Sequence, residues 1–266
     1  MTATHAVVLA AGLGTRMRRA AAAPLTEAQA AVADAGIKAM IPVGRPFLDY
    51  CLSALADAGL TDVCLVIGPA HDVIRRRYTE ELRPERLRIS FAVQERPVGT
   101  ANAVLAAEPV VGAVPFLVVN SDNLYPVAAL RALARLPGAG VIGYSREALI
   151  AESNIDPERI ARFALAWADD RGLLRALIEK PEPDQLDPAA FVSMNSWRFQ
   201  PSIFDACREV RPSVRGELEL QDAVRILIER GEPIAVVPFA GGVLDLSSRT
   251  DVESVAVAVR SIDVRV

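Results

Sequence analysis

Histidine and cysteine are scarce in this sequence. There are two histidines, His5 and His71, and three cysteines, Cys51, Cys64 and Cys207, all far apart along the chain. This spacing lacks the clustered ligands of a zinc site, and the apolar surroundings of the cysteines favour buried free thiols over disulfides or metal ligands. Any metal chemistry should therefore use oxygen ligands, which points to Mg²⁺.

Long apolar runs and a basic excess are also missing. Hydrophobic residues make up 52% of the 266 residues, which excludes a disordered chain, yet no uninterrupted apolar stretch is long enough to cross a bilayer. The net charge of −4 argues against a basic nucleic-acid-binding surface. The first expected strand follows Met1 almost at once and leaves no room for a signal peptide. We therefore expect a cytoplasmic protein whose partners are neither membranes nor nucleic acids.

A glycine-containing loop follows the first expected strand. The apolar run Val7–Leu9 leads into Ala10-Ala11-Gly12-Leu13-Gly14-Thr15-Arg16. Glycines let backbone N–H groups approach a ligand, and N–H groups gathered in this way bind anions. Arg16 adds a guanidinium fork suited to phosphate oxygens. The loop thus predicts a phosphate site, although a strand-to-helix turn without a ligand has the same local pattern. The P-loop of NTPases and the dinucleotide fingerprint are excluded, because the Gly-Lys-Ser/Thr ending and the third glycine are missing.

Strand-like and helix-like segments alternate through the first half of the chain. This alternation is typical of an α/β fold with a mainly parallel sheet and helices on both faces. A segment from Ala20 to Gly36 interrupts it, and we expect a short inserted helix that has Pro24 in its first turn and ends at Gly36. Two roles are possible for this helix: a surface insertion without a function in binding, or a flap over a triphosphate. We expect strands near residues 5–10, 62–67, 87–93, 114–119 and 139–144, and helices near 47–58, 70–81, 99–107 and 126–135.

The second half has a mixed and partly antiparallel pattern. Strand-like runs at Ile160–Ala168 and Leu173–Glu179 flank Asp169-Asp170-Arg171-Gly172, a composition typical of a hairpin turn. Further strands are expected near 190–199, 233–239 and 242–246, and helices near 201–208, 218–230 and 249–260. Because no linker separates the halves, we expect one Rossmann-like domain over residues 1–266, with lobes at about 1–145 and 146–266.

Polar residues stand at several points where strands are expected to end. Asp122 follows the apolar run Phe116–Asn120, at the edge where open α/β sheets bind ligands, although such an aspartate is often only a turn former. Lys38 lies among apolar residues and Asp245 lies before the last helix. In isolation the lysine could simply reach solvent, and the aspartate could belong to a capping turn. Together the two carboxylates suit Mg²⁺, which commonly binds one or two carboxylates and substrate phosphates.

In their order along the chain, these segments resemble the motifs of the sugar-1-phosphate nucleotidylyltransferases. The stretch Leu9–Met17 matches the family's opening motif, an apolar strand followed by Ala/Gly-Gly-x-Gly-Thr-Arg. Lys38-Ala39-Met40-Ile41-Pro42 is similar to the family's lysine segment, which contacts the NTP phosphates. For the loop, the resemblance implies that the nucleotide is bound by Leu9, Ala11, Gly12, Gly14, Thr15 and Arg16.

The stretch Gln94–Ala103 is similar to the family's Gln-x-x-Pro-x-Gly-Thr-Ala motif. The resemblance implies that Gln94, Gly99 and Thr100 bind the nucleotide, with the glutamine amide on the base. An amide offers a donor and an acceptor, which favours UTP or dTTP without excluding other bases. From the residues alone, a turn is expected here and Thr100 can cap the following helix.

The resemblance also implies a metal site and a sugar site. Asp122 and Asp245 resemble the family's two Mg²⁺-binding aspartates, and Arg16, Lys38 and Asp122 would be catalytic. Glu179-Lys180-Pro181 is similar to the family's Glu-Lys-Pro, whose glutamate accepts from sugar hydroxyls and whose lysine meets the sugar phosphate.

Two further segments match family runs with differences. Ser193–Phe199 is similar to a sugar-side strand, with Asn195 in place of a glycine and Trp197 in place of a tyrosine. Asn195 would therefore bind the sugar phosphate together with Glu179 and Lys180. Arg215–Ala223 matches a run that we interpret as favourable charge at a helix N-terminus.

The implied activity is transfer of a nucleoside monophosphate (NMP) from an NTP to a sugar 1-phosphate, with release of pyrophosphate. Two alternatives stay open: a non-sugar acceptor, such as phosphocholine or a cofactor phosphate, or a catalytically silent nucleotide-sensing subunit. The joint presence of Arg16, Lys38, Asp122 and Asp245 speaks against the silent subunit. A homo-oligomer is also left open.

Overall fold

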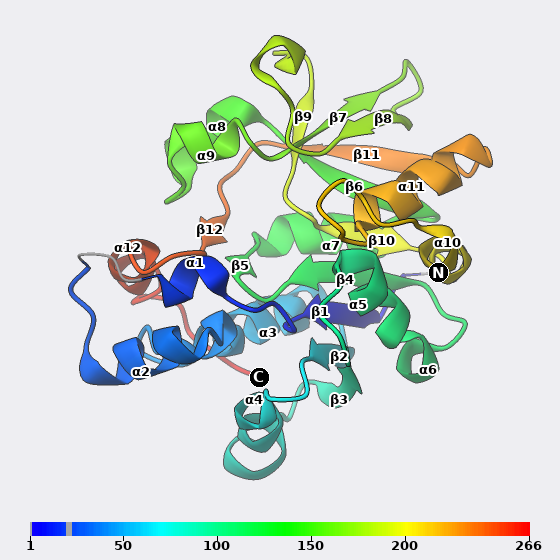
Figure 1. Ribbon diagram of the computed structural model, residues 1–266. Helices are drawn as coiled ribbons and strands as arrows, with labels where there is room; N and C mark the ends of the chain where they lie inside the picture. The colour runs from blue at the N-terminus through cyan, green and yellow to red at the C-terminus, as the bar shows by residue number, and fades with distance from the viewer. Residues whose placement is uncertain (1, 20–22) are drawn as a thin grey trace.

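The computed structural model describes residues 2–19 and 23–266. In this part the chain forms one large sheet with helices on both faces and a second, two-stranded sheet (Figure 1). The strands are β1 (His5–Leu9), β2 (Asp62–Ile67), β3 (Arg88–Val93), β4 (Phe116–Asn120), β5 (Asn123–Leu124), β6 (Ala139–Tyr144), β7 (Ala164–Ala168), β8 (Leu174–Ile178), β9 (Phe191–Ser193), β10 (Trp197–Phe199), β11 (Ile234–Phe239) and β12 (Leu244–Asp245). The expected α/β fold class is confirmed.

Helices follow most of the strands. They are α1 (Thr15–Arg18), α2 (Glu27–Ala35), α3 (Phe47–Ala58), α4 (Asp72–Arg76), α5 (Thr100–Ala106), α6 (Glu108–Val111), α7 (Val127–Arg135), α8 (Arg146–Glu152), α9 (Pro157–Ile160), α10 (Ser202–Glu209), α11 (Leu220–Glu229) and α12 (Asp251–Ala258). Two 3₁₀ turns, η1 (Lys38–Met40) and η3 (Pro183–Gln185), and a π-helical turn, η2 (Arg77–Glu81), complete the set. The short helices α1, α6, α8 and α9 were not expected from the sequence.

The parallel part of the large sheet places the ends of four strands at one edge. The sheet order is β3-β2-β1-β4-β10-β6-β9-β7-β8, and β11 also pairs with β6. Strands β1 to β4 are parallel, with Leu9 opposite both Val66 and Asn120, and Ile67 opposite Val93. The loops that follow β1, β3 and β4 therefore leave from the same edge, where open α/β sheets bind ligands.

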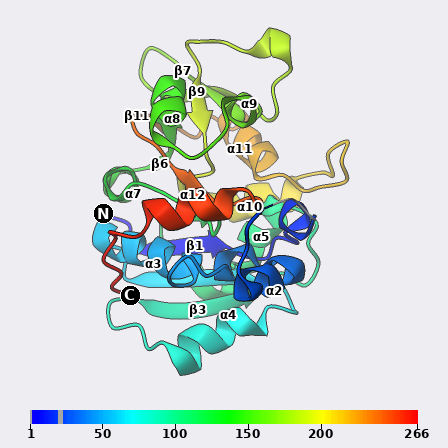
Figure 2. The same cartoon turned by 90° about the vertical axis from the view of Figure 1, so that its left-hand side faces the viewer.

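The later strands make the other side of the sheet mixed and partly antiparallel, as expected, with β11 parallel to β6. Strand β10 runs antiparallel to β4 and β6, and β7 pairs antiparallel with β8 and β9. The β7–β8 turn forms as predicted: Asp169 N–H donates to the Leu173 carbonyl, and Gly172 has a φ of +74°. Figures 1 and 2 both show β7 and β9, with α8 and α9, on one side of the parallel strands and α4 on the opposite side.

Two strand predictions in the second half were wrong in their boundaries. The strand expected from Ile160 begins only at Ala164, because Asp156 accepts from the Glu158 N–H and Pro157 fills the first position of α9. The strand expected over 190–199 is two strands, since Asn195 adopts a φ of +56° between them. These two strands are β9 and β10.

The inserted helix has its expected body and exit but a later start. Helix α2 begins at Glu27, where Thr26 and Gln29 form a capping box, so Pro24 precedes the helix. It ends at Gly36, whose φ is +76°. The start of the expected insertion, residues 20–22, lies outside the described residues.

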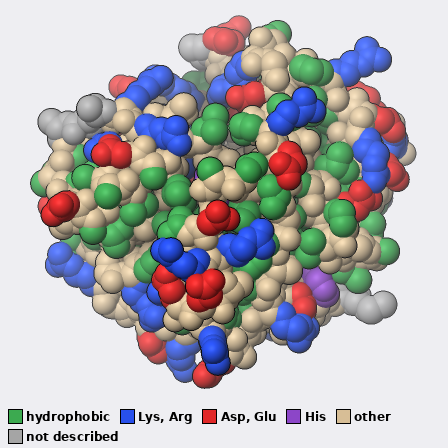
Figure 3. Space-filling model, turned by 60° about the horizontal axis from the view of Figure 1, so that its bottom comes forward, with side chains coloured by type: hydrophobic (Ala, Val, Ile, Leu, Met, Phe, Trp, Pro, Cys, Tyr) green, Lys and Arg blue, Asp and Glu red, His purple; other side chains and the backbone are tan. Residues whose placement is uncertain are grey.

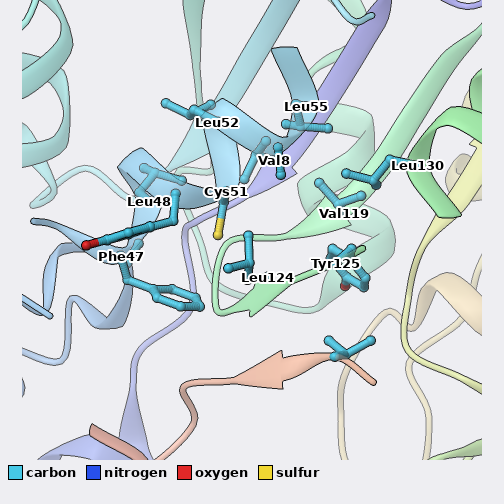
Figure 4. Close-up of a cluster of buried hydrophobic side chains, with 14 of the residues drawn as sticks. Val8, Phe47, Leu48, Cys51, Leu52, Leu55, Val119, Leu124, Tyr125 and Leu130 are labelled. Carbon is cyan, nitrogen blue, oxygen red and sulfur yellow. The ribbon is translucent and has the colours of Figure 1, made fainter. Parts of the chain in front are cut away.

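The core has two layers because successive strand residues face opposite sides of the sheet. Val8 packs in the layer that includes α3 and α7, and Val7 packs in the layer that includes α5, α10 and α11. Figure 4 shows part of the first layer, with Cys51 among aliphatic side chains. All three cysteines are buried and free, which confirms the expectation of structural thiols.

In residues 2–19 and 23–266, no helix is both long and apolar enough to span a bilayer. Figure 3 shows basic and acidic side chains interspersed over the face that it presents. That face therefore lacks the continuous basic surface that nucleic-acid binding uses.

Candidate active site

An open cleft lies at the carboxyl ends of β1, β3 and β4. Its walls are the loop after β1, the connection from β3 to α5, and the residues after β4. The cleft has a volume of about 370 Å³, within the range of small-molecule binding sites. Among the predicted residues, its lining contains Leu9, Ala11, Gly12, Thr15, Lys38, Gln94, Gly99, Thr100, Asp122 and Asn195.

The two loop glycines have different surroundings. A Cβ atom at Gly12 would meet nothing within 4 Å, so this position faces open space beside the cleft. Gly14 has a φ of +60°, and a Cβ atom there would lie 2.1 Å from the Gly36 carbonyl oxygen. The guanidinium of Arg18 also donates to the Ala35 carbonyl at 2.8 Å. Gly14 therefore lets the end of α2 pack on the loop, and it does not line the cleft.

Gln94 presents one atom of its amide to a ligand. The side chain is buried, and its Nε2 donates to the Gly99 carbonyl at 2.9 Å and to Asn102 Oδ1 at 3.0 Å. Both N–H groups of the amide are thereby used within the protein, and this network fixes which way the amide faces. The remaining polar atom, Oε1, is an acceptor suited to an N–H group of a base.

The β3–α5 connection is supported from behind by the chain before α11. Gly99 has a φ of +130°, and a Cβ atom there would lie 2.3 Å from the Leu218 carbonyl oxygen. Leu218 N–H donates to the Val98 carbonyl at 2.7 Å, and Leu220 N–H donates to Thr100 Oγ1 at 2.9 Å. The prediction that Thr100 caps α5 was wrong, because its hydroxyl caps the start of α11 instead. Sequence reasoning missed this support, which pairs residues more than a hundred positions apart.

A second cleft adjoins the first. It has a volume of about 390 Å³ and shares Asn120, Asp122 and Asn195 with the first cleft. Asp122 therefore stands where the two clefts meet. The other predicted residues that line this second cleft are Arg16, Glu179, Lys180 and Asp245. Arg16 thus faces the second cleft, although it was predicted with the nucleotide residues.

Two residues of the second cleft hold unusual backbone angles. Lys180 has a φ of +49°, and Asn195 has a φ of +56°. Lys180 precedes Pro181, which disfavours the right-handed helical region at that position. Asn195 Oδ1 accepts from Gln221 Nε2 at 3.1 Å and from Trp197 Nε1 at 3.3 Å, which holds this asparagine in place. Residues other than glycine with positive φ values are disfavoured, and they occur most often at binding and active sites, where the surrounding structure holds them in place.

Glu179 has a strongly altered acidity. Burial and, next, the negative charge of Glu219 raise the pKa of its carboxyl to about 7, while the positive charge of Arg215 opposes the shift. The more distant carboxylates of Glu217 and Asp222 also raise this pKa. Near neutral pH this side chain can therefore either accept or donate a hydrogen bond in the second cleft.

Two carboxylates line the second cleft, and one of them, Asp122, also lines the first. Lys38 Nζ forms an ion pair with Asp122. Asp245 is 4% exposed, accepts from Asn123 Nδ2 at 3.0 Å, and forms an ion pair with Arg159. Burial and the charge of Asp122 raise the pKa of Asp245, so the two carboxylates interact electrostatically.

This pair fits Mg²⁺ and fits a transition-metal site poorly. Both groups line the second cleft and offer the hard oxygen ligands that Mg²⁺ prefers. Among the residues that the structure describes, no three or more His, Cys, Asp or Glu side chains gather to hold a metal by themselves. A cation at Asp122 and Asp245 would therefore take its other ligands from substrate phosphates and water, which is how Mg²⁺ commonly binds.

Fold and site together define an α/β nucleotidyltransferase. A sequence model described as nucleotidyl transferase matches residues 5–252. The chain belongs to this family and, within it, to the sugar-1-phosphate nucleotidylyltransferases, as its similarity to named members also shows.

Named relatives cover most of the chain. UTP–glucose-1-phosphate uridylyltransferase AglF of Haloferax volcanii is 32% identical over 252 residues, which are 93% of each chain. A glucose-1-phosphate thymidylyltransferase of Streptomyces antibioticus is 34% identical over 237 residues, 89% of this chain and 60% of the relative. The crystal structure of a UDP-glucose pyrophosphorylase complexed with UDP-glucose has a TM-score of 0.75 at 20% identity, covering 96% of this chain and 97% of the other. That likeness supports the fold.

Proposed function

We propose that this enzyme transfers NMP from an NTP to a sugar 1-phosphate, giving an NDP-sugar and pyrophosphate, with Mg²⁺ as its cofactor. The observation that carries the proposal is the position of Asp122, at the junction of two clefts. Gln94 and the glycine loop lie on one side, and Glu179 and Lys180 lie on the other. The names of the relatives support a uridine or thymidine nucleotide and glucose 1-phosphate as substrates.

The reaction is a displacement at phosphorus. An oxygen of the sugar phosphate attacks the α-phosphorus of the NTP, a new P–O bond forms, and the bond to the β-phosphate oxygen breaks so that pyrophosphate leaves. Such a transfer depends on positioning and charge neutralisation more than on a protein nucleophile. When bound, Mg²⁺ supplies Lewis-acid stabilisation of phosphate charge, and Asp122 and Asp245 would hold it.

The residues of the clefts divide the work of binding. Backbone N–H groups around Gly12 would meet the triphosphate, and Gln94 Oε1 would accept from the base. Lys38 and Arg16 would offset phosphate charge from the two sides of the junction. This division makes residues of about 1–145 a nucleotide lobe and residues of about 146–266 a sugar lobe of one domain.

The sugar side would use Glu179, Lys180 and Asn195. Glu179, when ionised, would accept from sugar hydroxyls, and the Lys180 ammonium would meet the sugar phosphate. Asn195 lines both clefts and is held by Gln221, so it would place the acceptor phosphate beside the nucleotide.

The test is pyrophosphate release with Mg²⁺ for every combination of NTP and a panel of sugar 1-phosphates and phospho-alcohols. We expect turnover with UTP or dTTP and one sugar 1-phosphate, and none with Asp122→Asn. Turnover with a phospho-alcohol alone would replace the sugar acceptor by the non-sugar alternative. Nucleotide binding without turnover of any acceptor would indicate a sensing subunit.

A further inference from the structure

One excursion of the chain surrounds Asp245. After β6 the chain leaves the sheet, forms α8 and α9, and returns as β7 (Figure 1). This excursion, residues 145–160, approaches the strand that carries Asp245 closely: a Cβ atom at Gly242 would lie 2.2 Å from the Glu152 carbonyl oxygen. The close approach brings side chains of the excursion onto Asp245.

The backbone of Asp245 is held by a single side chain. Asp245 N–H donates to Asn154 Oδ1 at 2.8 Å, and Asn154 Nδ2 donates to the Asp245 carbonyl at 2.9 Å. The asparagine amide therefore pairs with this residue as a neighbouring strand would. Both the N–H and the carbonyl of Asp245 are fixed from one side.

The carboxylate of Asp245 is held at both oxygens. Its Oδ2 accepts from Asn123 Nδ2, and its Oδ1 accepts from the guanidinium of Arg159. Arg159 also donates to Asp251 at 2.7 Å, and Asp251 is itself fixed by the Ser248 N–H. Asp245 and Asp251 are both buried, so the guanidinium is clamped between two buried, hydrogen-bonded carboxylates.

We propose that Asn154 and Arg159 are positioning residues that set the Asp245 carboxylate for the divalent cation. This inference rests on the proposed function, which places the cation at Asp122 and Asp245. An ionised carboxylate offers about four lone-pair sites, so the bonds from Asn123, Arg159 and Ser247 still leave one for a metal. The clamp therefore orients the ligand without blocking it. Asp122 differs, because its cationic partner is the flexible side chain of Lys38.

Positioning and charge have opposite effects at Arg159, which makes the role testable. Removing a positive charge beside a cation site should by itself strengthen cation binding. Loss of orientation should weaken it, by the 10- to 100-fold typical of residues that support metal ligands. Arg159 also lowers the pKa of Asp245, so its loss favours the protonated acid. A weaker affinity that does not recover as pH is raised therefore reports positioning. Arg162 provides the matched control, since it is exposed in the same cleft and makes no hydrogen bond or ion pair with Asp245.

The experiment is Mn²⁺ binding to the full chain, measured by electron paramagnetic resonance with UTP and no acceptor. We expect about 10- to 100-fold weaker Mn²⁺ affinity in Arg159→Met, a smaller loss in Asn154→Ala, and partial recovery in Arg159→Lys. Arg162→Met should keep or slightly tighten the affinity. In turnover, Arg159→Met should raise the Mg²⁺ concentration for half-maximal rate more than it lowers kcat.

Two results separate this inference from the proposed function. If Arg159→Met and Asn154→Ala keep their melting temperature and bind Mn²⁺ as the wild type does, the positioning role is overturned. Should Arg159→Met fail to fold, Asn154→Ala and Arg159→Lys decide the question alone. Asp245→Asn tests the metal site itself: unchanged Mn²⁺ affinity there would overturn the proposed site, whatever Arg159 does.

Discussion

Lys38 and Asp122 form an ion pair at the junction of the two clefts, although 84 positions separate them in the sequence. The lysine comes from the turn η1 and the aspartate follows β4. Both side chains are partly exposed, at 19% and 16%, and ion pairs near the surface contribute little to stability. The pair is therefore available to exchange partners with a phosphate, and its loss should affect catalysis more than folding.

We expect Lys38→Met to lower kcat by about 10²- to 10³-fold, the effect of removing one preorganised group that stabilises transition-state charge. Its melting temperature should stay within a few degrees of the wild type, because the lost ion pair contributes little to stability. Pyrophosphate release and thermal unfolding provide the two measurements. A variant with near-normal turnover would remove Lys38 from the catalytic roles.

The scarcity of lysine allows a direct test of which substrate each lysine meets. Lys38 and Lys180 are the only lysines in the sequence. We expect Mg²⁺ and UTP to protect Lys38 from reductive methylation or pyridoxal phosphate, while Lys180 stays reactive until the sugar 1-phosphate is added. Mass spectrometry of the labelled peptides measures both. Protection in the reverse order would exchange the roles of the two lysines.

The two loop glycines should respond differently to the same substitution. Gly14→Ala places a Cβ atom against Gly36 at a positive φ, so we expect a stability loss of about 2–3 kcal/mol. Gly12→Ala meets no atom, so its melting temperature should not change, while its KM for the NTP rises at least about tenfold with the loss of one charged hydrogen bond. If Gly12→Ala and Gly14→Ala changed both the KM for the NTP and the melting temperature by the same amounts, the assignment of Gly12 to the phosphates would be contradicted.

Asn102 should control base selectivity although it does not face the base in our assignment. Its Oδ1 helps to fix the Gln94 amide so that only Oε1 is free. Uracil offers an N3–H donor to that atom, whereas cytosine offers a lone pair. We expect Asn102→Ala to lower the UTP-to-CTP ratio of kcat/KM about three- to tenfold, the worth of a neutral hydrogen bond. An unchanged ratio in a folded variant would contradict the fixed orientation of Gln94.

Glu179 should make stability fall as pH rises. Its folded-state pKa is about 7, above the value of an unfolded glutamate, so the folded chain binds more protons between those two values. Stability from this group is therefore complete below about pH 4.5 and is lost as pH rises through 7. Relative to Glu179→Gln, the wild type should lose about 1–2 kcal/mol between pH 5 and 8, after allowance for partial exposure. Chemical unfolding across that range measures this, and parallel pH profiles would contradict it.

The sequence predicted the parallel half of the fold more accurately than the antiparallel half. Segments such as Phe47–Ala58 carry their own signals, with an apolar body and Gly59 at the exit. The break at Asn195 and the short helix before Ala164 depend on local backbone choices that an apolar pattern does not reveal. Strand lengths in the second half were overestimated for that reason.

The candidate site was predictable in its parts but not in its supports. Asp122 and Lys38 lie in motifs that can be found one at a time. The contacts of Leu218 with Gly99, and of Asn154 and Arg159 with Asp245, join distant segments through backbone atoms and one clamped guanidinium. No local sequence pattern predicts these contacts, because they depend on which distant segments pack together in the folded chain.

The measurement that tests the central claim most directly is the fate of labelled phosphate from UTP or dTTP. The enzyme would be incubated with Mg²⁺, a sugar 1-phosphate and nucleotide labelled at either the α- or the γ-phosphate. We predict that the α-label appears in an NDP-sugar and the γ-label in pyrophosphate, in equal amounts, and that Asp122→Asn forms neither. Release of the γ-label as inorganic phosphate, or an α-label that never joins the sugar, would contradict NMP transfer.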